Sequence, residues 1–302
     1  METNEYQFKK IDLSEWEVFG GGGSGTSYYH ISDNSLILKL NKTSYPKSQT
    51  ITEYLHSKDA MALGIPTPKV FDLVTDGERF GYTAERVRNK KSFSRLLADD
   101  PKHMDDYCRQ LAELTLKLHS TPFIQEKVSV KTTNLADCYI DLIMSASHIP
   151  MDVKAQLQED YNMMEKRTTC LHGDLHFGNL LKSQDQNLWI DWNSFSYGDP
   201  YMDICNMELL ANYVPPQLIP ELFHFSHRRF KKCYKLFLKH YFGEKWNSTE
   251  VRQHIEASTR LRIGICIANK PRSTKLFLPV LQHQKVRFAI IRFFSRFIKV
   301  NL

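Results

Sequence analysis

The chain has 302 residues, of which 42 % are hydrophobic and 12 % aromatic, and its formal net charge is +6. This apolar content can form the core of one large globular domain or of two smaller ones. No Gly/Ser, Gln/Asn or Pro tract indicates disorder beyond the first few residues, and the sequence has no repeat of fixed period. That excludes low-complexity, fibrous and solenoid proteins.

The cysteines and the two ends of the sequence bear on its compartment. The six cysteines stand far apart without a Cys-x-x-Cys pair, which is not the spacing of a zinc or redox site. The polar start METNEYQFKK has no apolar run behind it, and FAIIRFF near the end is too short to span a bilayer. We therefore expect no signal peptide and a cytoplasmic location.

Positive charge is concentrated in residues 221–302, which hold 18 Lys/Arg against 4 Asp/Glu. Such a segment can bind nucleic acid, an anionic membrane surface or an anionic substrate. Helices with solvated Lys/Arg faces have the same composition, and we favour that interpretation. We expect no nucleic-acid partner.

The first third of the sequence predicts strands. EWEVF, TSYYHI and SLILKL are rich in β-branched and aromatic residues, and GGGGSG and the turn SDNS separate them. A helix is expected from about Ser48 to Leu63, where Gly64 ends it. KVFDLVTD and RFGYTAERV, divided by Asp76-Gly77, predict two further strands.

After Arg88 the pattern becomes helical. Asp100-Pro101 is a typical helix start. Apolar residues then recur at i, i+3 and i+4 spacing, namely Met104, Tyr107, Cys108, Leu111, Leu114, Thr115 and Leu118. Residues 153–166 predict another helix, 170–192 a polar loop with a short strand, and the chain from Pro216 onward helices punctuated by Gly243 and Pro271.

These elements predict an α+β fold with two lobes. The N-terminal lobe, residues 1–87, would be a small antiparallel β-sheet with one helix and a glycine loop. The larger lobe, residues 88–302, would be mainly helical.

The segment HGDLHFGN, residues 172–179, followed by IDWNSFSYGDP, residues 190–200, is the strongest functional signal. Asp174 and Asn179 have the spacing of the Asp and Asn in a kinase catalytic loop, and Asp191 ends a short apolar strand. Phosphoryl transfer needs a carboxylate that orients the acceptor hydroxyl, and ligands for the metal that neutralises the phosphates. The pattern predicts Asp174 as catalytic base and Asn179 and Asp191 as magnesium ligands.

Two other interpretations of this segment are weaker. His172, Asp174 and His176 are residue types of a metal-hydrolase site, but no further His or Cys ligand follows at suitable spacing. A polar turn without chemistry would not explain why Asp191 and the upstream elements fit the same machinery.

Those upstream elements are a glycine loop, a strand lysine and a helix carboxylate. The run GGGGSGTSYY lies between two predicted strands, where backbone amides can approach phosphates. Lys39, in the apolar strand LILKL, needs a partner if it is buried. We expect it to contact the α- and β-phosphates and to pair with Glu53, although Asp59 on the same helix is an alternative partner. The strand end FGYTAERV would offer backbone groups of Glu85 and Val87 to an adenine edge.

The combination of HGDLHFGN with IDW and GDPYMD resembles the signature of the aminoglycoside phosphotransferase and choline kinase superfamily, and the resemblance covers most of the chain in order. It implies the two-lobe protein-kinase-like fold, Mg²⁺, and ATP or GTP as phosphoryl donor. By this resemblance Asp174 is catalytic and Asn179 and Asp191 hold magnesium. Ser24, Gly25, Thr26 and Ser27 would cover the phosphate bound by Lys39, and His172 and Asp203 would brace the catalytic loop. His176 matches the family pattern without an assigned role.

The predicted activity is therefore that of a small-molecule kinase acting on a hydroxyl group. Aminoglycosides are polycations and need an acidic site, whereas residues 221–302 are strongly basic and residues 121–170 hold 5 Lys/Arg against 7 Asp/Glu. A neutral or anionic acceptor is therefore expected, although placed carboxylates such as Asp137 and Asp141 would override a summed charge.

Two competing functions stay open at this point. A non-catalytic nucleotide-binding module would keep the fold, but the set Lys39, Asp174, Asn179 and Asp191 is intact. A protein kinase is disfavoured because Asp191-Trp192-Asn193 stands where DFG would be and no APE motif follows. The C-terminal KVRFAIIRFFSRFIKVNL can form a helix, which we expect to pack on the large lobe rather than on a membrane. We expect a monomer or a dimer.

Overall fold

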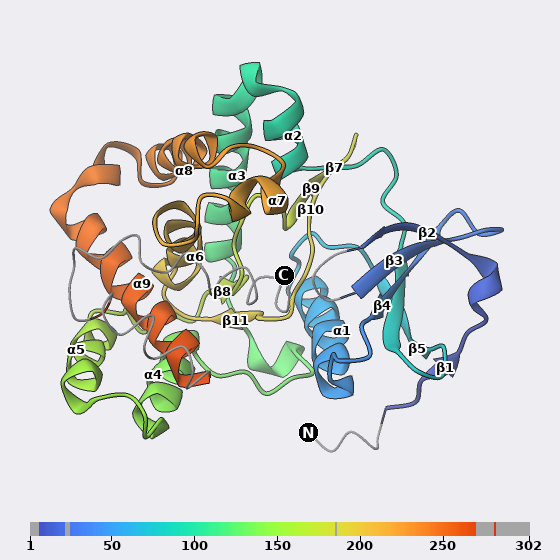
Figure 1. Ribbon diagram of the computed structural model, residues 1–302, viewed down its shortest axis with the longest axis horizontal. Coiled ribbons are helices and arrows are strands. Elements are labelled where there is room, and N and C mark those ends of the chain that lie inside the picture. Colours follow the sequence, from blue (N-terminus) through green and yellow to red (C-terminus); the bar gives the residue numbers. More distant parts are fainter. Residues whose placement is uncertain (1–5, 22–24, 185, 270–280, 282–302) are drawn as a thin grey trace.

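The computed structural model describes residues 6–21, 25–184, 186–269 and 281 of the chain. An N-terminal β-sheet with one helix is followed by a larger, mainly helical part (Figure 1). The predicted α+β class is confirmed. Among the described residues, no helix is both long and apolar enough to cross a membrane. The expected C-terminal helix lies outside them.

The N-terminal sheet has six strands within the described part of the chain, in the order β1-β5-β6-β4-β3-β2. They are β1 (Lys9–Lys10), β2 (Trp16–Gly21), β3 (Gly25–His30), β4 (Leu36–Asn41), β5 (Val70–Thr75) and β6 (Phe80–Glu85). Neighbouring strands pair antiparallel, as predicted, except that β1 adds to β5 in parallel. The short 3₁₀ helix η2 (Leu13–Glu15) precedes β2.

The two faces of this sheet have different neighbours, because successive side chains of a strand point to opposite sides. Leu38 and Leu40 of β4 pack with Trp16 and Tyr28 on one face. The other face packs on α1 (Lys47–Ala62), in a cluster that includes Tyr82. Lys39, between the two leucines, therefore points toward α1. This helix begins and ends one residue earlier than predicted, and Gly64, with φ +80°, follows its C-cap Leu63.

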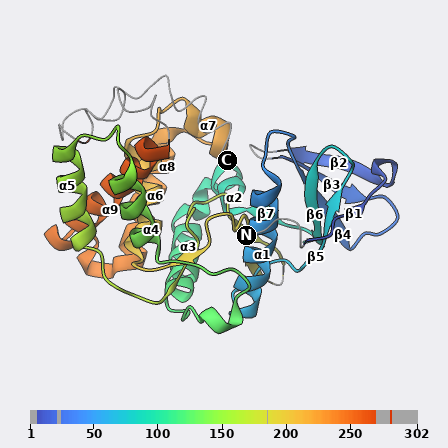
Figure 2. The ribbon, with the colours of Figure 1, turned by 90° about the horizontal axis from the view of Figure 1, so that it is seen from below.

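The helix α1 also contacts the second lobe. His56 Nδ1 lies 3.0 Å from the Trp192 carbonyl oxygen, and Trp192 Nε1 donates to Thr67 Oγ1 at 2.9 Å. Both views show α1 between the sheet and the helices (Figures 1 and 2). After β6 the chain crosses to β7 (Lys91–Ser92), which pairs with β9 (Leu180–Lys182) beside the catalytic loop.

The helical part contains small sheets and a set of packed helices. In the described residues the remaining strands are β8 (Cys170–Leu171), β10 (Asn187–Trp189) and β11 (Ser196–Tyr197). The α-helices are α2 (Phe93–Asp99), α3 (Met104–His119), α4 (Leu135–Ser145), α5 (Met151–Asn162), α6 (Tyr201–Asn212), α7 (Leu218–Phe223), α8 (His227–Phe242) and α9 (Thr249–Asn269). Short 3₁₀ turns are η3 (Pro101–His103), η4 (Gln125–Lys127) and η5 (Gly243–Asn247).

The predicted apolar stripe of α3 is confirmed, since Cys108, Leu111 and Leu118 are buried in the main core. Gly243, with φ +59°, ends α8 as expected, while Pro271 lies outside the described residues. The predicted helix 153–166 is wrong at its end, because α5 stops at Asn162. The Glu165 N–H donates instead to the Asp199 carboxylate at 2.7 Å, a tertiary contact that competes with the helix.

Candidate active site

The loop between β8 and β9, residues 172–179, is held by Asp203 of α6. The fully buried Asp203 carboxylate accepts hydrogen bonds from the backbone N–H groups of His172 at 2.7 Å and Gly173 at 2.6 Å. His119 Nε2 lies 3.0 Å from the same carboxylate. Gly173 has φ +78°, and a Cβ there would lie 2.0 Å from the Ser194 carbonyl oxygen. Asp203 and this close approach together set the path of the loop.

His172 links the loop to the strand that carries Asp191. Its Nδ1 accepts the Asp174 N–H at 3.3 Å, which leaves Nε2 to donate to the Ile190 carbonyl at 2.9 Å. The ring stacks on Trp192. Burial lowers the pKa of His172 below its ordinary value, so the neutral ring makes these contacts. His172 thus lies in a bracing position between two functional segments.

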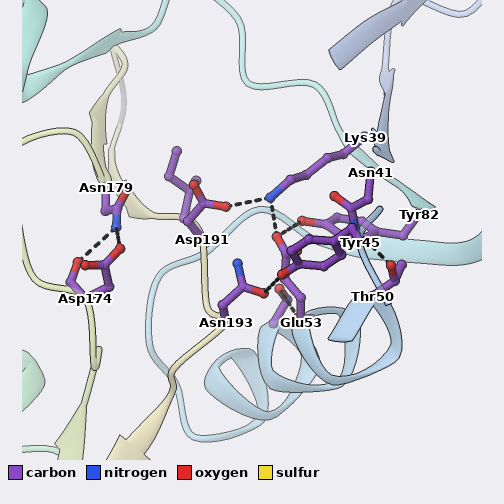
Figure 3. Close-up of polar contacts among 12 residues, drawn as sticks. Lys39, Asn41, Tyr45, Thr50, Glu53, Tyr82, Asp174, Asn179, Asp191 and Asn193 are labelled. Atoms are coloured by element: carbon purple, nitrogen blue, oxygen red, sulfur yellow. Dashed lines mark hydrogen bonds and ion pairs between the residues drawn. The ribbon is translucent and has the colours of Figure 1, made fainter. Parts of the chain in front are cut away.

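The Asp174 carboxylate is held from two sides and remains accessible. Asn206 of α6 donates to Oδ1 at 2.8 Å. Asn179 Nδ2 approaches Oδ2 at 3.4 Å (Figure 3). His176 accepts the Gly178 N–H at Nδ1, so its Nε2–H faces Asp174 Oδ2, 3.6 Å away. The Asp174 side chain is 24 % exposed.

Asp174 is ionised at neutral pH. Burial alone would raise its pKa, but His176, and after it Arg262, lower the pKa well below the usual range. An ionised carboxylate with a free surface can accept a hydrogen bond from a hydroxyl group and later its proton.

Asp191 and Asn179 lie on adjacent chain segments. The Ile190 N–H donates to the Asn179 carbonyl at 3.0 Å, which brings Asp191 next to the end of the catalytic loop. Asp191 adopts φ +65°, and its side chain is 42 % exposed. The Lys39 ammonium group, 2.6 Å from Oδ1, is the largest cause of the lowered pKa of Asp191.

These two side chains fit a magnesium ion. Asn179 uses its Nδ2 to donate to the Asp174 carbonyl at 2.9 Å, which leaves Oδ1 available as a ligand. Asp191 Oδ2 forms no hydrogen bond within the described residues. Mg²⁺ is commonly held by one or two protein oxygens together with substrate phosphates and water, so a larger cage is not required. In the described residues no group of three His, Cys, Asp or Glu forms a separate metal site.

Lys39 is placed between the two lobes. Its Nζ contacts Glu53 Oε1 as well as Asp191, and the Tyr82 hydroxyl donates to the same Glu53 oxygen at 2.8 Å (Figure 3). Burial would lower the pKa of Lys39, but Asp191 and Glu53 raise it, so the ammonium group stays charged. Of the two carboxylates considered as its partner, the structure brings Glu53 to Lys39. Asp59 instead accepts the N–H groups of Ser129 and Val130 at 2.7 and 3.2 Å.

The residues expected around the phosphates are only partly brought together. Ser27 lies directly opposite Lys39 in the β3–β4 register, on the same face of the sheet. Thr26 pairs with Leu40 and shares the opposite face, so only its backbone is available on the Lys39 side. Gly25 has no room for a side chain, because a Cβ would lie 2.2 Å from the Leu40 carbonyl. Ser24 lies outside the described residues.

The chain segment after β6 offers backbone groups near the lobe junction. The Glu85 N–H donates to the Lys69 carbonyl at 2.8 Å, and the Arg86 N–H to the Ser35 carbonyl at 2.7 Å. In the described part of the chain, the Val87 N–H has no acceptor. Glu85 and Val87 are the two residues predicted to contact an adenine edge. The Val87 N–H is thus available as a donor, whereas Glu85 can offer only its carbonyl group.

The comparison with family models decides the relationship. The model of the phosphotransferase enzyme family, APH, matches residues 15–226. The chain belongs to this family. It is therefore a phosphotransferase enzyme of the small-molecule kinase kind, and the resemblance seen in HGDLHFGN and GDPYMD is confirmed. Among curated proteins, no sequence matches significantly.

Solved structures share the family fold at low sequence identity. The ADP-bound aminoglycoside phosphotransferase APH(2'')-Ib has 15 % identity and a TM-score of 0.58, over 92 % of this chain and 94 % of that one. A choline/ethanolamine kinase family protein from Mesorhizobium loti has 14 % and 0.55, over 88 % and 81 %. An aminoglycoside-3'-phosphotransferase of type VIII has 18 % and 0.54, over 83 % and 94 %. This likeness establishes the protein-kinase-like fold.

Sequence reasoning missed several residues that this phosphotransferase places at the site. Asn206 follows Asp203 at i+3 on α6, so helical spacing would have put both on the loop side. Tyr45 donates to Asn193 at 2.8 Å across the lobe junction. Arg262, on α9, reaches the Gly173 carbonyl from far along the sequence, and no local pattern announces it.

Proposed function

We propose that this phosphotransferase transfers the γ-phosphoryl group of ATP or GTP to a hydroxyl group of a small acceptor. The observation that carries the proposal is the convergence of Asp174, Asn179, Asp191 and the Lys39–Glu53 pair at the junction of the two lobes (Figure 3). Phosphoryl transfer depends on positioning and charge stabilisation, and these side chains provide both.

Asp174 orients the acceptor hydroxyl and takes its proton. The lowered pKa of its carboxyl group makes it a weak base in the ground state. A loose transition state needs proton transfer only late, so an ionised, well-oriented carboxylate suits the task. Asn206 and His176 hold that carboxylate in place. His172 and Asp203 act through the loop backbone as positioning residues.

The nucleotide would bind between the lobes. Lys39, kept charged by Asp191 and Glu53, binds the α- and β-phosphates, and Ser24, Gly25, Thr26 and Ser27 cover them. The Glu85 carbonyl and the Val87 N–H face the adenine edge. Asn179 and Asp191 would hold Mg²⁺, which neutralises charge on the phosphate oxygens. We place the boundary between the nucleotide lobe and the catalytic lobe after residue 87.

The acceptor is proposed to be neutral or anionic rather than a polycation. Part of the positive charge of residues 221–302 is exposed to solvent on α8, namely Lys231, Lys232, Lys235 and Lys239. The summed charge therefore supports the proposed acceptor class only in part. Asp137, one of the carboxylates that would favour a cation, already binds Lys166. The charge next to Asp174 therefore matters more than the total.

The test is ADP release with ATP and Mg²⁺ across a panel of hydroxyl compounds that includes aminoglycosides, choline, homoserine, sugars and anionic glycans. Asp174→Asn should lower turnover by about 10²–10⁴-fold while nucleotide affinity is retained. Asp152→Asn, at an exposed site on α5, is the matched control. Nucleotide binding without turnover on any acceptor would favour a non-catalytic nucleotide-binding module, and an aminoglycoside product would refute the acceptor proposal.

A further inference from the structure

Arg262 of α9 approaches the catalytic loop from the helical side. Its Nη1 donates to the Gly173 carbonyl at 3.3 Å and to the Tyr139 hydroxyl of α4. Gly173 directly precedes Asp174, so the guanidinium group lies beside the residue that we assign as catalytic. Helix α9 packs against α4, α5 and α6, and it lies on the far side of the helical part from the N-terminal sheet (Figures 1 and 2).

The guanidinium group is charged and lacks a carboxylate partner. Burial would lower the pKa of Arg262, but Tyr139, then two cysteines and last Asp174 raise it overall. Within the described residues Arg262 forms no salt bridge, whereas Arg260, two positions earlier, is bound to the Asp160 carboxylate at 2.5 and 2.8 Å. Arg262 is partly rather than fully buried, so some of its surface remains accessible.

A placed cation of this kind has a consequence for the acceptor. The acceptor hydroxyl must come within about 2.6–3.2 Å of the Asp174 carboxylate before transfer. The rest of a small acceptor then lies within reach of neighbouring side chains. An arginine fork binds carboxylate or phosphate oxygens through paired hydrogen bonds and repels an ammonium group.

We propose that Arg262 anchors an anionic group, a carboxylate or a phosphate, on the acceptor of this kinase. The inference rests on the proposed function and narrows its substrate class. The matched family region ends at residue 226, so Arg262 belongs to the part of the chain beyond the shared catalytic machinery. That position suits a residue that selects the acceptor.

The test uses two sets of hydroxyl compounds, and the members of each set differ in one substituent at the same carbon atom. One set is glycerate, glycerol 3-phosphate, glycerol and 3-amino-1,2-propanediol, and the other is glucuronate, glucose 6-phosphate, glucose and 6-amino-6-deoxyglucose. Binding is measured by calorimetry or ligand-observed NMR with Mg²⁺ and a non-hydrolysable ATP analogue, and turnover is measured with ATP. We expect the wild type to favour the anionic members, and the better of the two anions identifies carboxylate or phosphate recognition.

Arg262→Met should weaken binding of the favoured anion, or raise its KM, by about 10- to 100-fold. The affinities for the neutral member and for the nucleotide should not change. Arg262→Lys should restore part of the affinity for the anion because it keeps the charge but not the fork. Arg262→Lys also replaces Arg262→Met as the test variant if the methionine variant folds poorly. Arg260→Met is the control, because it removes an arginine of the same helix that binds Asp160 and not the catalytic loop.

Three results would overturn the inference. One is an equal fall in kcat for anionic and neutral members with unchanged KM, because that result describes an arginine that only positions the loop. Another is preference for the amine members, or no preference within either set. The third is an anion preference that survives in Arg262→Met. Arg262-dependent anion binding without ADP release would instead refute the proposed kinase function and leave the anion site standing.

Discussion

Replacement of Gly173 by alanine should damage the catalytic loop far more than the same change at another glycine with almost the same backbone conformation. Gly173 has φ +78° and Gly64 has φ +80°. A Cβ at Gly64 meets no heavy atom within 4 Å, whereas at Gly173 it would lie 2.0 Å from the Ser194 carbonyl oxygen. The pair therefore separates the cost of the backbone angle from the cost of the close contact.

The magnitude of each effect can be worked out from this difference. A left-handed alanine costs about 1–2 kcal/mol, and about 0.4–1 kcal/mol is regained because alanine restricts the unfolded chain. Gly64→Ala should thus lower the free energy of unfolding by about 1 kcal/mol. At Gly173 the Ser194 backbone must also move by about 1 Å, and overpacking of this kind adds about 1–3 kcal/mol.

The assay is denaturant unfolding of both variants, combined with kinetics on any acceptor found in the panel. Ser194 follows Asp191 closely, so the displacement also disturbs the segment that carries Asp191. Misplacement by about 1 Å can cost about 10²-fold in rate. Equal stability and equal activity for the two variants would refute the claim that the contact with Ser194 sets the loop geometry.

Three further predictions concern the same site. Asp203→Ala leaves the N–H groups of His172 and Gly173 and the His119 ring without their buried acceptor, so unfolding free energy should fall by about 3–5 kcal/mol in denaturant titrations; a loss under about 1 kcal/mol would contradict the bracing role. Because burial lowers the pKa of His172 below 6.5, this histidine binds a proton more readily in the unfolded chain than in the folded protein. The free energy of unfolding should therefore rise with pH between about 5.5 and 7.5. In His172→Gln this slope should be smaller, and an unchanged slope would show that other groups cause it. Lys39→Met should weaken calorimetric ATP binding by about 10- to 100-fold through lost charge-assisted contacts, while the exposed Lys58→Met leaves it unchanged; equal affinities in the two variants would refute phosphate binding by Lys39.

Local patterns in the sequence were sufficient for the fold class, for the strands β2 to β6 and for the helices α1 and α3. The alternation in LILKL determines that Lys39 faces away from Leu38 and Leu40, and the 3.6-residue period of 104–118 determines the buried side of α3. The spacing of Asp174 and Asn179 and the strand before Asp191 were equally visible. These features depend on residues close together in the chain, so one sequence carries them.

What only the tertiary structure decided depends on contacts between distant segments. Two carboxylates on α1 were candidates for Lys39, and the packing of the helix on the sheet brings Glu53 to it while Asp59 binds the backbone at Ser129. Asn206 and Arg262 reach the catalytic loop from α6 and α9, two helices that pack against each other. Helical spacing from Asp203 would have suggested Asn206, but no periodicity of the sequence indicates that Arg262 reaches this loop. The chemistry of phosphoryl transfer was thus readable in the sequence, whereas the groups that restrain Asp174 and would select its acceptor depend on how the helices pack.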